Sequence, residues 1–581
     1  MTDRSENIYS QRNKALEILF AVLLLLLPLL KINQGVDLTD TPYSLGNYRF
    51  FEGADGVWVL ATFLSNVTGY LFTRLPFGGT MIGMKLYSSL LISFMALFSF
   101  RFFKTKMPMW IAFLGEVAAI GFCWCPSVIL YNYMTYLFFL ICGVLLFRGL
   151  AGNRPVCLFL SGISLGLNVS VRVPNILEAA LILCVWYYGA RKKKNFEQIA
   201  KETGLCIGGF LAAQAVMFLI ISLLYGFGAY GEMIGGLFGM SASASDYTFS
   251  EMLLSILSAY GRGIRWMVYP ALCILPGIPF LILWKDKGQT LRKIIYCACI
   301  VFLFFVLYKW GMFNFRYYQK ESGLQWGVVF LLISLGVTVW MLFTRMIDDE
   351  WMLIGSIALI MILITPLGSN NYVWPALNNL FFVAPVTFWM VYRFVRWGRS
   401  AVDSTGRVPF FPAKAMLAAL VLMFFVQSVG LLFGYVFLDG EDGTRRTAKV
   451  ENSPVLAGMY TSQSNAESLE SLFAYLQSHE ELDGKELILY GNIPGLSYYL
   501  DRPCAIRTSW PDLDTSSYED LKSDLNALST KIALTDIDKP TPLVILAADA
   551  QEGDKLSAIR DFMEEYSYQL AFQNERFLVY W

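Results

Sequence analysis

The sequence predicts a polytopic membrane protein, mostly α-helical, with a soluble α/β domain at its C-terminal end. Its 581 residues are 56% hydrophobic and only 15% charged, whereas an ordinary soluble protein carries about 25% charged residues. Apolar stretches of helical length recur between residues 15 and 437, as in a bundle of membrane helices. After residue 438 the pattern changes to short amphipathic helices and strands, which is typical of an α/β domain in water.

The membrane part is expected to comprise residues 1–437 and about thirteen spans. The first span, 15–30, follows Arg4, Arg12 and Lys14 and has no cleavage site of small residues after it. It is therefore expected to be a retained signal anchor with a cytoplasmic N-terminus. The other apolar stretches centre near residues 90, 116, 142, 163, 182, 214, 274, 301, 335, 358, 386 and 426. An odd number of spans places the C-terminal domain outside the cytoplasm.

The distribution of basic residues agrees with this topology, because Lys and Arg gather in all but one of the alternate loops, as on the cytoplasmic side of membrane proteins. These basic loops are 101–106, 148–154, 191–194, 285–293 and 393–407. The exception is the loop at Arg345, which continues with acidic residues at 348–350 and is also expected inside, because acidic residues count little in this rule. The loops expected outside are 31–78, 125–134, 170–176, 227–262, 310–325 and 367–378. The first of them is long, and its apolar segment 56–75 is expected to lie along the membrane surface as a helix.

The C-terminal domain, residues 438–581, is expected to be a small α/β sheet domain. Its predicted helices are 467–478, 518–528 and 554–566, and its predicted strands are 486–490, 542–547 and 576–581. A glycine turn at 491–495 follows the first strand, but it lacks the spacing of a nucleotide-binding loop. A plain strand-to-helix connection is expected there.

Composition excludes several classes of function. Lys plus Arg and Asp plus Glu are both 45, so no charge excess indicates a nucleic-acid partner. The single histidine, His479, lies in the C-terminal domain, which excludes Ser-His-Asp hydrolysis and histidine-rich metal sites in the membrane part. Acid–base chemistry there must come from carboxylates or tyrosines.

Candidate catalytic residues open the first outer loop, in QGVDLTDTPYSLGNYRFFEG. Its chemical groups are Asp37, Asp40, Tyr43, Tyr48, Arg49 and Glu52. Two carboxylates three residues apart, Asp37 and Asp40, can supply a base or hold a divalent cation such as Mg²⁺ or Mn²⁺. The structural alternative is that Asp40 is the N-cap of a short helix with Pro42 in its first turn.

The architecture resembles the GT-C superfamily of membrane glycosyltransferases, which use lipid-linked sugar donors and include protein O-mannosyltransferases and aminoarabinose transferases. The shared features are a cytoplasmic N-terminus, an acidic first outer loop with surface helices, and a C-terminal outer domain. Many bacterial members carry an Asp-Glu-x-x-Tyr-like motif in that loop. This chain has Asp40-Thr41-Pro42-Tyr43, so Thr41 replaces the second acid and Tyr43 is one residue closer. The resemblance implies Asp40 as the catalytic base and Asp37 as a supporting acid or metal ligand.

A polyprenyl phosphate leaving group is anionic and needs cations at the membrane boundary. Candidate phosphate contacts in the outer loops are Arg172, Arg262, Arg265, Arg316 and Lys320. The amides Asn370 and Asn371, in the segment 368–379, and the tyrosines of 131–136 suit a sugar. The alternatives are arginines at helix ends with their charge in the headgroups and an ordinary interfacial aromatic belt.

These features predict a cell-membrane enzyme that transfers a sugar from a polyprenyl-phosphate donor to a glycan, lipid or protein on the outer face, with inversion at the anomeric carbon. A transporter or lipid flippase is an alternative, and it predicts internal repeats and buried charges at mid-span. A polysaccharide polymerase or ligase uses similar donors but usually has its large outer loop between later helices. A non-catalytic relative would only bind a partner through residues 438–581.

Overall fold

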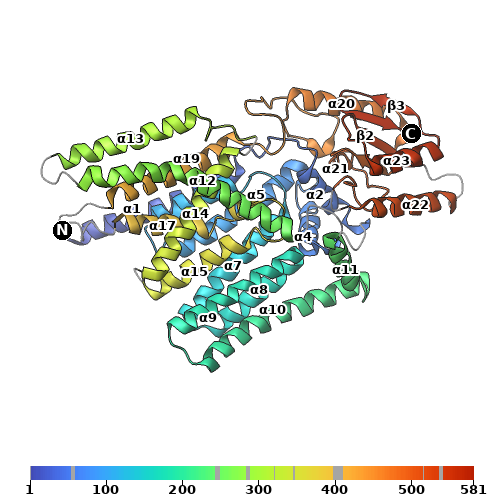
Figure 1. Ribbon diagram of the computed structural model, residues 1–581. Coiled ribbons are helices and arrows are strands. Elements are labelled where there is room, and N and C mark those ends of the chain that lie inside the picture. The colour runs from blue at the N-terminus through green and yellow to red at the C-terminus, as the bar shows by residue number, and fades with distance from the viewer. Residues whose placement is uncertain are drawn as a thin grey trace.

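The computed structural model describes residues 2–53, 59–242, 249–282, 288–318, 321–344, 347–396, 410–513, 516–534 and 541–581. Figure 1 shows a bundle of helices on the left and the C-terminal domain on the right, with the N-terminus at the far end of the bundle from that domain. The predicted fold class, a mostly helical bundle with a C-terminal α/β domain, is confirmed.

A helix lies at each of the predicted span centres. The bundle helices are α1 (Thr2–Leu26), α5 (Met81–Phe103), α6 (Met109–Phe122), α7 (Leu130–Ala151), α8 (Pro155–Val171), α9 (Ile182–Arg191), α10 (Phe196–Tyr225), α11 (Ala229–Ala242), α12 (Phe249–Ile282), α13 (Gln289–Lys309), α14 (Glu321–Thr344), α15 (Asp349–Ile364), α16 (Trp374–Asn378), α17 (Val383–Arg396) and α19 (Phe411–Gly434). The 3-10 helix η3 (Val173–Leu181) precedes α9. Among the described residues, eight helices are long and apolar enough to cross a membrane. The number thirteen stays a prediction.

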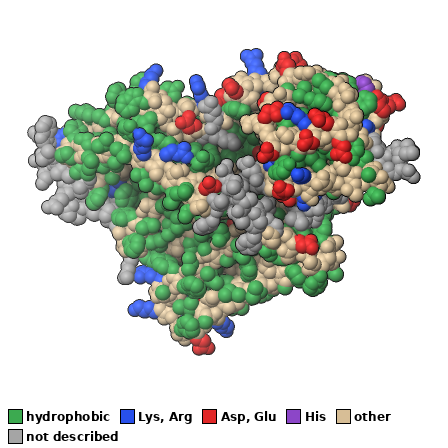
Figure 2. All heavy atoms as spheres, turned by 45° about the vertical axis from the view of Figure 1, so that its right-hand side comes forward, with side chains coloured by type: hydrophobic (Ala, Val, Ile, Leu, Met, Phe, Trp, Pro, Cys, Tyr) green, Lys and Arg blue, Asp and Glu red, His purple; other side chains and the backbone are tan. Residues whose placement is uncertain are grey.

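The surface of the bundle is apolar where it is not covered by protein. In the most hydrophobic stretches of α10, α12 and α13, only 22%, 17% and 22% of the residues are buried. In Figure 2 apolar side chains cover the bundle, whereas acidic and basic side chains gather over the C-terminal domain. Helices satisfy their own backbone hydrogen bonds, so this surface suits a lipid environment, as in a multi-pass membrane protein.

The predicted outer loop 227–262 is helical over most of its length, which corrects the sequence analysis. Residues 229–242 form α11, and α12 already begins at Phe249. Leu253, Leu254 and Leu257 follow the spacing of a helix face, whereas the glycines and serines of the sequence 226–245 resemble a loop. Two candidate phosphate contacts therefore lie inside a long helix.

Two of the predicted basic loops, 101–106 and 191–194, contact the start of α15. Lys106 forms an ion pair with Glu350 at 2.6 Å, and Lys192 forms one with Asp349 at 2.7 Å. These contacts join the loop after α5, the end of α9 and the start of α15. Loops that the charge pattern places on the same side of the membrane thus lie at the same end of the bundle, and this supports the predicted alternation of the spans.

Topology gives a direct prediction. A reporter fused after Lys194 should report the cytoplasm, and one fused after Arg445 should report the outer side, because basic loops stay on the cytoplasmic face. Paired alkaline phosphatase and fluorescent protein fusions measure this, with a fusion after Arg154 as the cytoplasmic control. A cytoplasmic C-terminal domain would contradict the whole architecture.

The described residues of the first loop, and the turn just before it, carry short helices. They are η1 (Leu27–Leu29), α2 (Asp40–Arg49), η2 (Phe51–Gly53) and α4 (Phe63–Thr73). With 11 residues, α4 is too short to cross a membrane, as expected for the segment 56–75, of which residues 56–58 lie outside the described part. Because α2 packs against both α4 and the C-terminal domain, this loop lies at the junction of the two parts (Figure 1).

The C-terminal domain contains the predicted helices and strands. Its elements are η4 (Pro454–Leu456), α20 (Gln463–Gln477), η5 (Glu480–Leu482), β1 (Leu487–Tyr490), α21 (Leu496–Tyr499), α22 (Tyr518–Leu534), β2 (Leu543–Ala547), α23 (Asp554–Glu565), β3 (Leu570–Gln573) and β4 (Phe577–Tyr580). The sheet order is β1-β2-β4-β3, with β1 and β2 parallel and the other pairs antiparallel. Strand β3 was not predicted, because it is short and mostly exposed.

The two faces of this sheet pack against different partners. Leu487, Leu489 and Ile545 belong to the same continuous apolar core as the membrane helices. Ile488 and Val544 face the other way, into a smaller core with α22 and α23. Successive strand residues point to opposite faces, so one face of the sheet packs at the junction with the bundle.

Candidate active site

Asp37 lies in the irregular segment before α2 and is only 2% exposed. Its Oδ2 accepts a hydrogen bond from the main-chain nitrogen of Thr41 at 3.1 Å, and so satisfies a donor in the first turn of α2. Thr39 occupies the N-cap position, and its side chain makes no capping bond. The alternative that Asp40 is the N-cap is therefore wrong, and Asp37 has the capping role.

Asp40 is the first residue of α2 and is half-buried. A carboxylate in a first helical turn is stabilised by the helix dipole. Beside burial, the charge of Asp40 raises the pKa of the Asp37 carboxyl and of the hydroxyls of Tyr43 and Tyr435. Of the two acids, Asp40 thus has the exposure that a base in contact with substrate needs.

Lys85, near the start of α5, is a charged neighbour of Asp37 that was not predicted. Its Nζ donates to the carbonyl oxygens of Gln34 at 3.0 Å and Gly35 at 2.7 Å. Burial raises the pKa of the Asp37 carboxyl to about 7, an effect that the charge of Lys85 opposes and that of Asp40 strengthens. A lysine at the outer end of an apolar span runs against the usual charge distribution, and that signal could have identified it.

The raised pKa of Asp37 predicts a pH-dependent stability. The unfolded carboxyl loses its proton near pH 3.8 and the folded one near pH 7. The contribution of Asp37 to the free energy of unfolding is therefore fully present below pH 3.8 and decreases as the pH rises to about 7. Asp37→Asn keeps an acceptor for Thr41 and has no proton to lose. The melting temperature of the variant relative to wild type should rise by ~2 °C or more between about pH 4.5 and about pH 7.5. A thermal-shift series in detergent measures this, and a difference that does not vary with pH would contradict it.

An aromatic cluster lies beside the acid pair. Burial, and then the charges of Asp37 and Asp40, raise the pKa of the Tyr435 hydroxyl. The ring of Tyr435 is 6.4 Å from Trp124, whose ring is 5.1 Å from Trp374. Trp374 belongs to the predicted sugar-binding segment 368–379, so the cluster connects that segment with the acids.

Three of the predicted polar segments meet on the other side of this cluster. The guanidinium of Arg172 donates to the carbonyl oxygen of Gly368 at 2.5 Å, and that of Arg262 lies 5.3 Å from the ring centre of Tyr372. Asn370 is half-buried, and Asn371 is exposed with its amide 3.0 Å from Ser369 Oγ. Cations from two elements and the amides of a third are therefore gathered at one place.

The structure does not bring every candidate cation to this place. Arg265 is exposed on α12, and Arg316 is exposed in the segment before α14. Lys320 lies outside the described residues. The segment of Arg316 is nevertheless joined to the start of the C-terminal domain, because the main-chain nitrogens of Tyr317 and Tyr318 both donate to one oxygen of Asp442.

Helix α2 also faces the C-terminal domain across a polar cavity of about 360 Å³. Tyr43 packs edge-on against Trp510, with ring centres 5.4 Å apart. Burial raises the pKa of the Tyr43 hydroxyl, and hydrogen bonds with Thr508 and Asn47 oppose this increase. The cavity is lined by Gly46, Asn47, Arg49, Phe50, Glu52, Ser497, Pro503, Cys504, Ile506, Arg507 and Ser509. An amide, two guanidinium groups and hydroxyls thus lie next to the candidate base helix.

The expected divalent cation does not fit the residues around Asp37. Within the described part of the chain, no three or more His, Cys, Asp and Glu side chains form a group that could hold a metal. Asp37 Oδ2 is already bonded to Thr41, and the Lys85 ammonium competes for the same charge. Mg²⁺ and Mn²⁺ prefer oxygen-rich octahedral sites, so the reaction proposed below has no step through a metal.

Comparison with known proteins identifies the fold. No protein-family model and no curated protein sequence matches the chain. The crystal structure of ArnT from Cupriavidus metallidurans bound to undecaprenyl phosphate is similar, with a TM-score of 0.51, 9% identity, and 97% of this chain and 98% of that chain covered. An oligosaccharyltransferase from Archaeoglobus fulgidus matches with a TM-score of 0.45, 13% identity, and 98% and 74% of the two chains covered. The likeness to ArnT extends over both chains, and the chain has the GT-C fold.

Proposed function

We propose that this chain is a membrane glycosyltransferase that moves a sugar from a polyprenyl-phosphate donor to an acceptor on the extracytoplasmic face, with inversion. The observation that supports this most is the placement of Asp37 and Asp40 where the bundle meets the C-terminal domain, joined through aromatic rings to a segment that holds Arg172 and Arg262. ArnT, which has the same fold, is described in complex with undecaprenyl phosphate, and we extend that class of lipid to this chain.

In the proposed reaction, Asp40 removes the proton of the acceptor hydroxyl. The hydroxyl oxygen attacks the anomeric carbon of the donor, while the bond from that carbon to the phosphate oxygen breaks. One direct displacement inverts the configuration. Asp37 positions the first turn of α2 through the hydrogen bond that its carboxylate accepts from Thr41 N.

The polyprenyl phosphate leaves with the electron pair of the broken bond and needs positive charge in the transition state. We assign this role to Arg172 and Arg262, which contact Gly368 and Tyr372 of the same segment. We assign hydrogen bonds with the sugar to Asn370 and Asn371. Arg265, Arg316 and Lys320 remain further candidates for contacts with the anionic headgroup. Tyr43 would contact the acceptor beside Asp40.

The proposal is tested with the purified full-length protein, a polyprenyl-phosphate donor labelled in its sugar, and acceptors extracted from cell envelopes. We expect one polyprenyl phosphate released for each sugar transferred, and a product with the anomeric configuration opposite to that of the donor. A product with retained configuration would contradict direct displacement, and an intact donor with every acceptor fraction would contradict the transferase.

One observation favours a transporter or flippase as the second candidate. Glu116 in α6 is fully buried, and Glu178 in η3 is 3% exposed and hydrogen-bonded to Asn168. Buried carboxyl groups inside a bundle are typical of transport pathways. The two candidates differ in chemistry, because a flippase leaves the bond between sugar and phosphate intact.

A further inference from the structure

The segment that carries Asp37 is bound through its main chain over residues 33–38. Between residue 30 and Asp40 the chain forms neither a helix nor a strand of its own. Tyr460 bonds to it twice: its nitrogen donates to Asn33 O at 2.8 Å, and its carbonyl oxygen accepts from Gly35 N at 2.9 Å. The nitrogen of Gly495 donates to Leu38 O at 2.9 Å. The carbonyl oxygens of Gln34 and Gly35 accept from Lys85. The other carbonyl oxygens of residues 33–38 accept from groups of the C-terminal domain.

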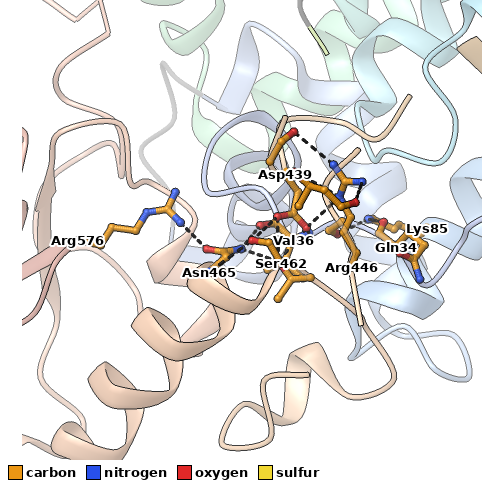
Figure 3. Close-up of polar contacts among 12 residues, drawn as sticks. Gln34, Val36, Lys85, Asp439, Arg446, Ser462, Asn465 and Arg576 are labelled. Carbon is orange, nitrogen blue, oxygen red and sulfur yellow. Dashed lines mark hydrogen bonds and ion pairs between the residues drawn. The ribbon is translucent and has the colours of Figure 1, made fainter. Parts of the chain in front are cut away.

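The side chain of Asp439 is central to these contacts and is 3% exposed. Its Oδ2 accepts from Val36 N at 3.0 Å, and both carboxylate oxygens accept from the Thr461 hydroxyl at 2.9 and 2.8 Å. Arg446 lies alongside, with its Nε 3.8 Å from Oδ2. Figure 3 shows Asp439 between Val36 and Arg446, in the polar junction of the two parts.

A second line of contacts reaches the same segment from the sheet. Asn465, in the first turn of α20, donates from its amide to Val36 O at 2.8 Å. Its own amide oxygen accepts from Arg576, just before β4 (Figure 3). Both polar main-chain groups of Val36, the residue before Asp37, are thus held by C-terminal side chains. The Tyr499 hydroxyl donates to the carbonyl oxygen of Asp37 itself.

We infer that the C-terminal domain is a positioning element for the candidate catalytic loop, with Asp439 as its principal positioning residue and Tyr499 as the second. The inference rests on the proposed function, and it adds a role for residues 438–581 that the transfer chemistry alone does not require. An irregular segment lacks the regular main-chain hydrogen bonds of a helix or sheet, so its position depends on the groups that bind its main chain. A displacement of about 1 Å in a catalytic group is enough to cost about 100-fold in rate.

The test compares Asp439→Ala, Asp439→Asn and wild type as full-length proteins. Alanine leaves Val36 N without its acceptor, whereas asparagine retains an oxygen for it. We expect Asp439→Ala to lower kcat by about 10- to 100-fold with KM for the donor changed less than about threefold. Asp439→Asn should recover kcat to within about threefold of wild type. Equal loss in both variants, or an unchanged kcat in Asp439→Ala, would overturn the inference.

Tyr499→Phe provides a milder variant should Asp439→Ala fold poorly. It removes one hydroxyl from a buried ring that otherwise keeps its shape, and we expect kcat to fall by about three- to tenfold. The matched control is Asp483→Ala, because Asp483 is largely exposed in the same domain and pairs only with Arg502 among the described contacts. Normal kcat in Tyr499→Phe would overturn the role of that residue.

Hydrogen exchange separates this inference from the proposed function, because it needs no activity. In Asp439→Ala, amides of the peptide 33–49 should exchange at least about tenfold faster than in wild type, since local opening becomes easier when Val36 loses its partner. Peptides of α14 and α19 serve as internal references. Unchanged exchange in 33–49 would refute the positioning role even if transfer is observed, and faster exchange in a protein without transfer would refute only the proposed function.

Discussion

Asp40→Asn is expected to reduce turnover of a polyprenyl-phosphate sugar by about 100-fold or more, the scale for loss of a positioned general base. The substitution keeps the size of the side chain. Asp37, which accepts the hydrogen bond from Thr41 N in the first turn of α2, is unchanged in this variant, so folding and thermal stability should stay normal. Turnover is measured in membranes as loss of labelled donor, with expression and melting temperature determined in parallel.

Asp483→Asn is the control, an exposed carboxyl on the outer domain. If Asp40→Asn keeps full transfer while Asp37→Asn or Glu52→Gln abolishes it, Asp40 is not the base, although the class of enzyme stands. If none of the three substitutions changes transfer, this loop has no catalytic role.

Arg172→Gln should raise KM for the lipid donor by about 10- to 100-fold, because hydrogen bonds to a charged phosphate contribute about 1.5–3 kcal/mol each. Glutamine retains a donor for Gly368 O, to which Arg172 is bonded at 2.5 Å, so the segment 368–379 should keep its position. Initial rates over a range of donor concentrations separate KM from kcat.

Arg154→Gln is the matched control for that experiment. Arg154 precedes the same helix, α8, at its opposite end, where the topology places the cytoplasm. Equal values of KM in wild type and Arg172→Gln would show that Arg172 holds the segment 368–379 without contacting the donor.

Much of the fold could be predicted from the sequence because its signals are local. Apolar length located the helices of the bundle, and short apolar runs bounded by turns located β1, β2 and β4. The predicted loop 227–262 is mostly helical in the described residues, and the prediction failed because the glycines and serines of the sequence 226–245 resemble a loop. Strand β3 escaped because its mostly exposed side chains carry no inside–outside pattern.

The candidate site could be predicted only in part. Asp37 and Asp40 stand out because charged groups beside a membrane helix are rare and costly. Their partners do not, because Val36 and Asp439 are 403 positions apart in the chain, and no local pattern indicates which side chain will bind an irregular main-chain segment. Tertiary packing of the C-terminal domain decides that, and so only the structure reveals it.

The most direct test of the central claim follows the fate of the donor in proteoliposomes. A polyprenyl-phosphate sugar, labelled in both sugar and lipid, is incorporated with wild type, Asp40→Asn or no protein, and an acceptor extract is supplied on the side of the C-terminal domain. Our account predicts that wild type separates the two labels, with sugar on the acceptor and free polyprenyl phosphate in the membrane, whereas Asp40→Asn leaves them joined. Intact donor moved between leaflets at the same rate by both proteins would contradict it and identify a flippase.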